Sequence, residues 1–467
     1  MCVCGGAWTK REEMLRKHRP RELTILDRVY EHISLPPLVV AAIDTPAFQR
    51  LRSLHQLGAS SFLYPGAVHT RFEHSIGVAH MARTLLLNIQ HHQPDLGLSE
   101  VDIELGMLAG LLHDVGHGPF SHLFEDVVSR RCGIEFNHED MSEKIARRVL
   151  RDLVPQTHVD VVVGLMRGKA LLGITYGEII SNKRNGIDVD RLDYFIRDSM
   201  CCFGKPTVDV RVNRLFNSAR IVCEEGQWQL GFEQKLALSL REIFTLRAKL
   251  HKNVYQHQVT KAIGHMIGDV IHAAAPHFRV GGHTLVECAQ DETLFLKLGD
   301  WILEAIEASE APHLAEAHAI LHRLRTRDIY RVAYSSALDI TMRAPMAAVD
   351  WPAAILEHAH PSFPLNADDF IAEVVVINQG KGTEDPLESV LFFNPKKPSQ
   401  PLTRLKPAED LKHGSPLFTP LQFEERTLMV FERRPTNGAV QRACERLNAD
   451  PKYAAFFTDS LPFYNTK

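Results

Sequence analysis

The sequence predicts a mainly α-helical protein that ends in a smaller lobe of mixed helices and strands. Apolar residues recur at helical spacing through most of residues 70–335. Strand-like apolar runs gather beyond about residue 337, namely Ile371–Ile377, Ser389–Phe393 and Leu428–Glu432. The chain has 467 residues, of which 45% are hydrophobic and 24% charged, so it is long enough for two such parts and has ordinary globular composition.

The overall charge and the cysteines narrow the class of protein. Lys and Arg number 53 against 57 for Asp and Glu, a net charge of −4, which excludes a globally basic nucleic-acid binder. The eight cysteines show neither zinc-ribbon nor disulfide spacing, so a reducing intracellular setting is expected. No apolar run is long enough to cross a bilayer. We expect a soluble intracellular protein, in the nucleus, the cytosol or a mitochondrion.

The first half of the chain predicts helices between short breaks. Residues 1–21 are basic and are expected to form a poorly ordered lead-in. A helix is predicted over residues 37–58, which begin with prolines and end on glycine. Thr70 and Glu73 predict a capping box for a helix that runs to about His91. Ser99 and Asp102 predict another, for a helix that runs to residues 113–114.

The second half adds a hairpin and longer helices. Asn185-Gly186 is a turn signal before a helix over 187–198. Strands at 219–222 and 228–232 flank Glu-Glu-Gly and predict a hairpin. One long helix is predicted over 236–274, and helical structure over 293–335 and 435–447. The core is thus assigned to residues 22–336 and the C-terminal lobe to 337–467.

One motif carries the chemistry, Leu-Leu-His-Asp-Val-Gly-His-Gly-Pro-Phe-Ser-His at residues 111–122. His113 and Asp114 stand side by side at the end of an apolar helix, where they make a poor core. An imidazole and a carboxylate together suit a borderline or hard divalent ion. His117 and His122 follow within eight positions. The motif therefore predicts half of a metal site.

The other half must come from elsewhere in the chain. His74 lies on an apolar helix face one helix upstream, and Asp190, Tyr194 and Asp198 share a face at i, i+4 and i+8. Taken alone, His74 is more simply read as a core histidine satisfied by a hydrogen bond. The acids are equally well read as a solvated face. Together with His113 and Asp114, however, His74 and Asp190 are metal-ligand candidates.

These residues match the H…HD…D signature of HD-domain metal-dependent phosphohydrolases. Longer blocks resemble the HD-domain deoxynucleoside triphosphate triphosphohydrolase family, and in particular its vertebrate branch with a sterile alpha motif before the HD domain. The blocks are residues 44–52, 71–74, 113–122 and 181–198. The resemblance runs from about residue 24 to the end, and the sterile alpha motif has no counterpart because the chain starts just before the HD portion. It implies a helical HD-domain core with a smaller α+β lobe.

The resemblance also implies an activity. A divalent metal (Fe, Mn, Mg, Zn or Ni) would be held by His74, His113, Asp114 and Asp190. A deoxynucleoside triphosphate would be attacked at its α-phosphorus, giving deoxynucleoside and triphosphate and so controlling the nucleotide pool. A homo-oligomer, a dimer or a tetramer, is implied as well. His117, His122 and His138 match active-site histidines, and which of them is the general acid stays open. Read alone, His138 is equally well a surface loop histidine.

Substrate contacts are also implied by the resemblance. Arg191 stands where the family has Lys, which keeps the charge but changes the phosphate geometry. Read alone, Arg247 is a solvated helix charge and Tyr255 packs in the core. The matching positions are Gln56, Leu57, Arg71, His122, Arg191, Tyr194, Asp198, Arg247, His251 and Tyr255.

An activator site for GTP or a deoxynucleotide is matched only in part. Asp44, Gln49 and Arg52 match guanine-reading positions, and Arg214 and Lys235 match phosphate positions. Three family cations are replaced, by Thr24, Glu233 and Gln258. Each replacement removes a favourable contact with a polyanion. The hypothesis is that activation by guanine nucleotide is weakened, altered or lost.

Two other functions fit parts of the pattern. The same metal chemistry could act on another phosphoester such as a nucleoside monophosphate, although Arg71, Arg191 and Arg247 together favour a triphosphate. A nucleic-acid-binding protein or scaffold with a vestigial site is the other alternative. The complete set of ligand candidates and the acidic balance count against it.

Overall fold

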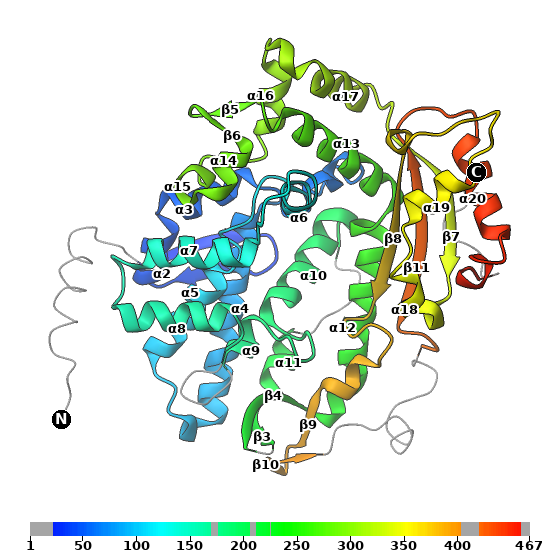
Figure 1. Ribbon diagram of the computed structural model, residues 1–467. Coiled ribbons are helices and arrows are strands. Elements are labelled where there is room, and N and C mark those ends of the chain that lie inside the picture. Colours follow the sequence, from blue (N-terminus) through cyan, green and yellow to red (C-terminus); the bar gives the residue numbers. More distant parts are fainter. Residues whose placement is uncertain (1–21, 170–175, 206–211, 225, 403–419, 459–467) are drawn as a thin grey trace.

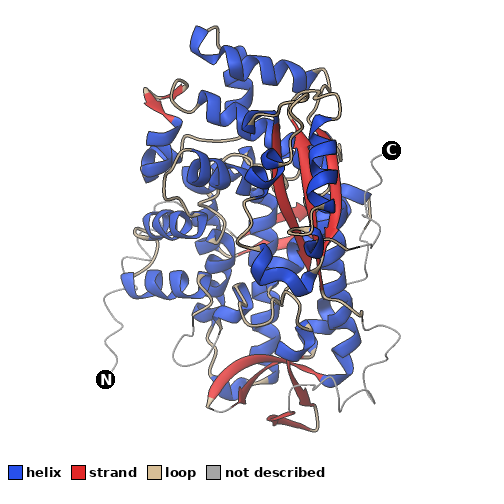
Figure 2. Cartoon of the chain, turned by 45° about the vertical axis from the view of Figure 1, so that its right-hand side comes forward, coloured by secondary structure: helices blue, strands red, loops and turns tan. Residues whose placement is uncertain are grey.

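The computed structural model describes residues 22–169, 176–205, 212–224, 226–402 and 420–458. The expected lead-in, residues 1–21, lies outside the described residues. Helices form most of the described chain, and strands gather in a three-stranded sheet on one side and a small sheet at one end (Figure 1, Figure 2). The prediction of a mainly α fold is confirmed. No described helix combines the length and apolar character needed for a membrane span.

The first described segment is a hairpin followed by short helices. Strands β1 (Leu23–Asp27) and β2 (Glu31–Leu35) pair antiparallel. The single helix predicted over 37–58 is wrong, because Thr45 and Pro46 start a new helix: the Thr45 hydroxyl accepts from the Phe48 amide, and proline at Pro46 cannot continue the ladder. The pieces are α2 (Pro37–Ile43), α3 (Pro46–Gln49), η1 (Arg50–Ser53) and η2 (Gly58–Phe62).

Helices α4 (Arg71–His92) and α5 (Glu100–Leu112) pack together in the core. The capping box at the start of α5 is confirmed, with the Asp102 amide donating to the Ser99 hydroxyl at 3.2 Å. The box predicted for α4 is wrong, since Thr70 makes no side-chain cap and Glu73 forms an ion pair with Arg28 at 3.0 Å.

The helices that follow surround α4 and α5. Helix α10 lies against α4 at Gly77, where a Cβ atom would meet the side chains of Asp193 and Arg197. Glycine at this position therefore lets the two helices approach. The turn predicted at 185–186 precedes α10, and the helix predicted over 187–198 is confirmed as α10, which begins at Val189. The elements are α6 (His122–Asp126), the π-helix η4 (Val127–Arg131), α7 (His138–Leu150), α8 (Gln156–Met166), α9 (Gly177–Ile180), α10 (Val189–Phe203) and α11 (Val212–Asn217).

The long helix predicted over 236–274 is interrupted. A π-helical turn, η6 (His251–Tyr255), separates α12 (Ala237–Leu250) from α13 (Gln258–Ala274), and η5 (Gln234–Leu236) precedes them. Such turns change which way side chains point and often lie at functional sites. Periodicity alone did not reveal it, because apolar residues continue at helical spacing on both sides.

The segment between α13 and the C-terminal sheet is mostly helical. The prediction of helical structure through residue 335 is wrong at its end, because residues from 331 onward form an edge strand of that sheet. The elements are β5 (Arg279–Val280), β6 (His283–Thr284), α14 (Leu285–Gln290), α15 (Glu292–Phe295), α16 (Ile302–Ala308), η7 (Pro312–Leu314), α17 (Ala315–Arg325) and β7 (Arg331–Leu338).

The three-stranded sheet is antiparallel, in the order β7-β11-β8. One face buries Leu428 and Val430 against α19 and α20, which cover it in Figure 1. The strand predictions at 371–377 and 428–432 and the helix at 435–447 are confirmed within longer or shifted bounds. The elements are η8 (Ile340–Met342), α18 (Arg343–Met346), α19 (Trp351–Glu357), η9 (Ala367–Asp369), β8 (Phe370–Asn378), β11 (Glu424–Glu432), α20 (Ala439–Ala449) and η12 (Ala454–Phe456).

The second sheet joins distant parts of the chain in the order β10-β9-β4-β3. The predicted hairpin is confirmed as β3 (Ala219–Glu224) and β4 (Gln227–Glu233). Strand β9 (Leu391–Asn394), also predicted, pairs parallel with β4 and antiparallel with β10 (Lys397–Leu402), after the turn η10 (Pro386–Ser389). A strand from beyond residue 337 thus completes a sheet of the helical body. The predicted boundary at 336/337 falls inside β7, and the division into two domains stays a prediction.

Candidate metal centre and active site

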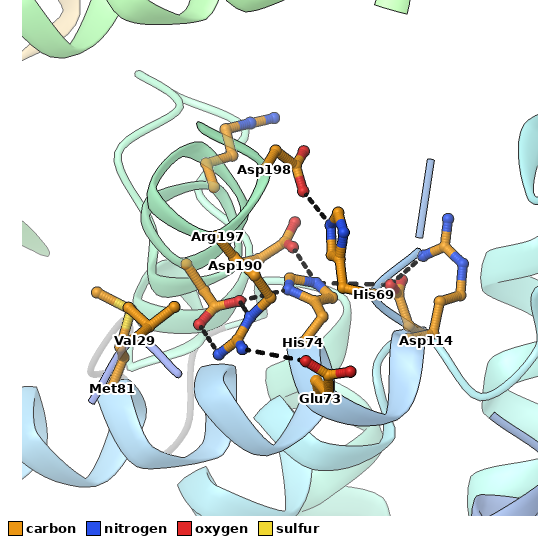
Figure 3. A network of polar contacts seen from close by, with 12 residues as sticks. Val29, His69, Glu73, His74, Met81, Asp114, Asp190, Arg197 and Asp198 are labelled. Atoms are coloured by element: carbon orange, nitrogen blue, oxygen red, sulfur yellow. Dashed lines mark hydrogen bonds and ion pairs between the residues drawn. The ribbon is translucent and has the colours of Figure 1, made fainter. Parts of the chain in front are cut away.

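Three metal-ligand candidates converge from three helices, and two of them, His74 and Asp190, are labelled in Figure 3. His74 comes from α4, His113 from the end of α5 and Asp190 from the first turn of α10. One ligand atom from each lies within 4.8 Å of the others. Asp190 Oδ1 is 3.1 Å from His74 Nε2 and 3.3 Å from His113 Nε2. The two imidazoles therefore face one carboxylate oxygen.

The His113 ring is oriented as a metal ligand requires. Its Nδ1 donates to the Gly110 carbonyl at 2.8 Å, and because a carbonyl only accepts, the proton belongs on Nδ1. The lone pair is then on Nε2, which is buried and has no hydrogen-bond partner among the described residues. Carboxylate oxygens of Asp114 and Asp190 each lie 3.3 Å from this nitrogen without such a hydrogen bond, and a cation between the three groups would satisfy them all.

His74 is held from its other side by a buried ion network. Its Nδ1 donates to Asp193 Oδ2 at 2.8 Å, and Asp193 is held in turn by two contacts from Arg197, at 2.9 and 3.0 Å, and by the Tyr30 hydroxyl at 2.8 Å. Burial opposes ionisation of Asp193, yet Arg197 and His74 hold its pKa below the usual range. A carboxylate behind a histidine fixes the ring and its tautomer in many metal sites.

Asp114 lies beside these three residues rather than among them. Its Oδ2 is 3.6 Å from His74 Nε2, and its Oδ1 is 3.3 Å from His113 Nε2. The same carboxylate is bound by Arg71 and lies 3.3 Å from His117 Nε2. Burial opposes its ionisation, but His113 and Arg71 lower the pKa of Asp114 well below its usual value. Two imidazoles and two carboxylates can hold a divalent metal here.

The three active-site candidates His117, His122 and His138 form a second cluster next to Asp114. His117 stacks on His138 with ring centroids 4.1 Å apart, and the His122 ring is 5.0 Å from His117. Burial, followed by repulsion from Arg71, holds the pKa of His117 well below its usual value, so it is neutral. A neutral imidazole can orient a nucleophile, and the neighbouring His122 side chain is exposed.

Glu125 orients the His138 ring and was missed by the sequence argument. Asn137 caps α7, accepting from the Asp140 amide at 3.0 Å, and thereby places His138 at the first position of the helix. The His138 Nδ1 donates to Glu125 Oε2 at 2.6 Å. Burial opposes ionisation of Glu125, but hydrogen bonds from His122 and His138 keep its pKa below the usual value.

The loop that carries His122 is strained and tied down. Phe120 and Ser121 have φ values of 57° and 62°, a region that side chains other than glycine rarely adopt. The buried carboxylate of Asp300 accepts from the Phe120 amide at 2.7 Å and from the His55 ring at 2.7 Å. The Arg71 Nε donates to the Ser121 hydroxyl at 3.0 Å. Asp300 was not predicted from the sequence, because it lies far along the chain from Phe120 and no local pattern marks it.

The phosphate-binding candidates surround the same centre. Arg71 is buried against Asp114, as described above, and the Tyr194 ring centroid is 6.3 Å from that of His74. Arg191 lies 3.0 Å from Asp188, the residue that caps α10. Arg247 on α12 donates to the Asn378 amide oxygen at 3.0 Å and to its carbonyl. Arg247 is therefore bound to the end of β8 rather than solvated.

Among the sugar-binding candidates, Tyr255 lies near Tyr194, with ring centroids 6.4 Å apart. Asp198 accepts from the Tyr255 hydroxyl at 2.6 Å and from His69 Nε2 at 2.7 Å. The main-chain N–H of Gln56 donates to the His69 carbonyl at 3.0 Å, and Leu57 follows Gln56 in the chain. His69 was missed by the sequence argument. The π-helix η6 carries both Tyr255 and His251, whose ring centroids are 5.0 Å apart. Burial, followed by repulsion from Arg247, lowers the pKa of His251 to about 3.

The activator candidates fall into two groups. The Gln49 Nε2 donates to the Ile43 carbonyl at 2.9 Å, Asp44 follows α2, and the Arg52 guanidinium lies 3.5 Å from the Phe72 ring centroid. Arg214 is on α11 and Lys235 in η5, and no contact within the described ranges joins them to the first group. Lys235 is ion-paired with Glu233, one of the three replaced positions, and Thr24 is exposed on β1.

Comparisons with known proteins agree with this geometry. The model of the HD domain matches residues 71–197, which include His74, His113, Asp114 and Asp190. The chain is 32% identical to deoxynucleoside triphosphate triphosphohydrolase SAMHD1 of Gallus gallus, covering 87% of this chain and 71% of that protein. A homolog of that enzyme in Dictyostelium discoideum is also 32% identical, and the match covers 88% of this chain and 77% of the homolog. The Homo sapiens enzyme is 28% identical, and the match covers 95% of this chain and 74% of that enzyme.

Proposed function

The chain belongs to the family of HD-domain deoxynucleoside triphosphate triphosphohydrolases, and we propose that it hydrolyses deoxynucleoside triphosphates to deoxynucleoside and triphosphate. The observation that carries this proposal is the meeting of two imidazoles and two carboxylates, one of which is bound by Arg71. We also propose that the active form is a homo-oligomer, as the family resemblance implies. Its substrate and product make it a regulator of the deoxynucleotide pool.

The metal centre consists in this proposal of His74, His113, Asp114 and Asp190. A divalent ion there supplies Lewis acidity for hydrolysis of a phosphoester bond. Because Arg71 binds Asp114 directly and its Nε holds Ser121, Arg71 keeps that carboxylate and the His122 loop in one arrangement. Arg71, Arg191 and Arg247 then attract and orient the triphosphate, as charge-assisted hydrogen bonds do.

The proton to the leaving 5′-oxygen is assigned to His122 or His138. Both rings lie beside the Glu125 carboxylate, which accepts from His138 Nδ1 at 2.6 Å, whereas burial and Arg71 hold the pKa of His117 well below its usual value. The deoxyribose is placed between Gln56, Asp198 and Tyr255. Since the Tyr255 hydroxyl already donates to Asp198, its ring is fixed at the position where a 2′-hydroxyl would otherwise fit.

The product of the reaction tests the function directly. Metal-loaded protein is incubated with each deoxynucleoside triphosphate, and the phosphate product is identified by anion-exchange chromatography. We expect inorganic tripolyphosphate and deoxynucleoside in equal amounts. Orthophosphate released from a nucleoside monophosphate would instead identify another phosphoesterase. If no product depends on the metal, the result would favour the alternative of a binding protein whose metal site is vestigial.

Activation by guanine nucleotide is expected to be weak or absent. Glu233 neutralises Lys235 through their ion pair, so one of the two phosphate-binding cations on this side is already occupied. Thr24 and Gln258 remove two further charges. Initial rates of deoxynucleotide hydrolysis, measured with and without added GTP, are expected to differ little. A rate that depends strongly on GTP would show that a different set of residues binds the activator.

A further inference from the structure

A small pocket next to Arg191 is lined by two parts of the chain. The helical body contributes Asn185, Arg191 and Arg247, and the loop after β8 contributes Gln379 and Lys381. Lys183 also lines it. The pocket thus has four cationic side chains, and no residue of its lining carries a carboxylate. Such a lining favours an anion with several charges.

Two buried side-chain amides that line this pocket each have one atom without a hydrogen-bond partner among the described residues, although Asn185 Oδ1 accepts from the Ile187 amide at 2.9 Å. Gln379 is 8% exposed and Asn185 is 1% exposed. Among the described residues, Gln379 Oε1 and Asn185 Nδ2 have no hydrogen-bond partner, although buried side-chain amides almost always have one. The Asn185 amide can donate to a phosphate oxygen. The Gln379 amide can do the same after a half-turn, because its two ends are nearly equal in shape.

The cations around these amides are only partly neutralised. Arg191 shares its charge with Asp188, and Lys183 lies 3.6 Å from Glu139. Arg247 donates to the oxygens of Asn378, which are neutral. Within the described part of the chain, no carboxylate lies within ion-pair distance of Lys381. The pocket therefore retains positive charge that a bound anion would satisfy.

We propose that this pocket binds the terminal phosphate of the triphosphate tail, and that Gln379 and Lys381 are substrate-binding residues contributed by the loop after β8. The inference rests on the proposed function and extends it to two residues outside the motifs that carry the family resemblance. Arg191, which lines the pocket, follows the ligand candidate Asp190 directly in the chain. A nucleotide with its α-phosphate at the metal would extend its tail toward Lys381.

The test removes one charge from the pocket. Lys381→Met keeps the aliphatic stem and removes the ammonium group, and Lys396→Met makes the same change at an exposed position outside the pocket. For K381M we expect the KM for a deoxynucleoside triphosphate to rise about tenfold, as loss of one charge-assisted hydrogen bond produces, with a smaller effect on kcat. Titration calorimetry with inorganic tripolyphosphate should show a similar loss of affinity. K396M should match the wild type in both measurements.

The two measurements separate this inference from the function on which it rests. If K381M keeps the wild-type KM and the wild-type affinity for tripolyphosphate, the pocket does not hold the terminal phosphate, even though the enzyme is active. If the wild type hydrolyses no deoxynucleotide, the proposed function fails. Tripolyphosphate binding that depends on Lys381 and not on Lys396 would then still support a polyphosphate pocket, and equal binding by both variants would overturn it.

Discussion

Replacing Asp190 with alanine is expected to lower hydrolysis at least about a hundredfold, since even the outer partners of metal ligands change activity by about 10–100-fold when they are removed. Asp190 is the carboxylate that both His74 Nε2 and His113 Nε2 face. Without it, the two imidazoles keep their places but lose the anion that would complete the centre. Hydrolysis rates and metal content per protein measure the effect together.

A second measurement makes the D190A result independent of activity. Mn²⁺ that binds the native state raises the melting temperature of the wild type by mass action, and D190A should show little of this rise. In a chelating buffer the two proteins should melt at similar temperatures. Asp152→Ala, at a side chain that is 76% exposed, is the matched control and should behave as the wild type. Full activity in D190A would remove Asp190 from the metal ligands.

Replacing Arg197 with methionine is expected to lower the free energy of unfolding by about 3–5 kcal/mol, the usual effect of breaking a buried ion pair from one side. Arg197 is fully buried and is bound to Asp193 and to Asp27, the latter at 2.9 Å. Its loss leaves two carboxylates in the core without a cation. Urea denaturation followed by circular dichroism measures the change.

Two further variants test the reason given for the R197M effect. Arg130→Met removes an arginine whose side chain is 83% exposed and whose partner is Asp126, and should cost at most about 1 kcal/mol. Asp27→Asn added to R197M removes one of the stranded charges and should recover part of the stability. If R197M unfolds at the same urea concentration as R130M, the buried contacts of Arg197 with Asp193 and Asp27 do not stabilise the fold.

Predictions from the sequence succeeded where the signal was local. The capping box of Ser99 and Asp102 needs only a four-residue pattern, and the structure contains it. Thr70 and Glu73 show the same kind of pattern, but Arg28, distant in sequence, binds Glu73 instead. The π-helical turn at residues 251–255 was not foreseen, since apolar residues keep helical spacing through it.

In the candidate site, too, residues with a local sequence signal were predicted and residues that act through distant contacts were not. The metal-ligand candidates could be named because their spacing and the family motif mark them. The residues that hold them could not, because Asp300 and Glu125 act through contacts that only the folded chain creates. Asp193 and Arg197 left a faint signal. They are spaced as i and i+4 on α10, which permits an ion pair, but nothing in the sequence says that His74 lies opposite.

The parallel pairing of β9 with β4 has a consequence for synthesis of the protein. Gly231 is aligned with Leu391, so one edge of β4 stays open until the ribosome has made residues far beyond the HD domain. An unpaired strand edge on a nascent chain is a template for wrong pairing and aggregation. Contacts between such distant residues also slow folding. We therefore expect the nascent chain to be most prone to aggregation in the interval before β9 is made.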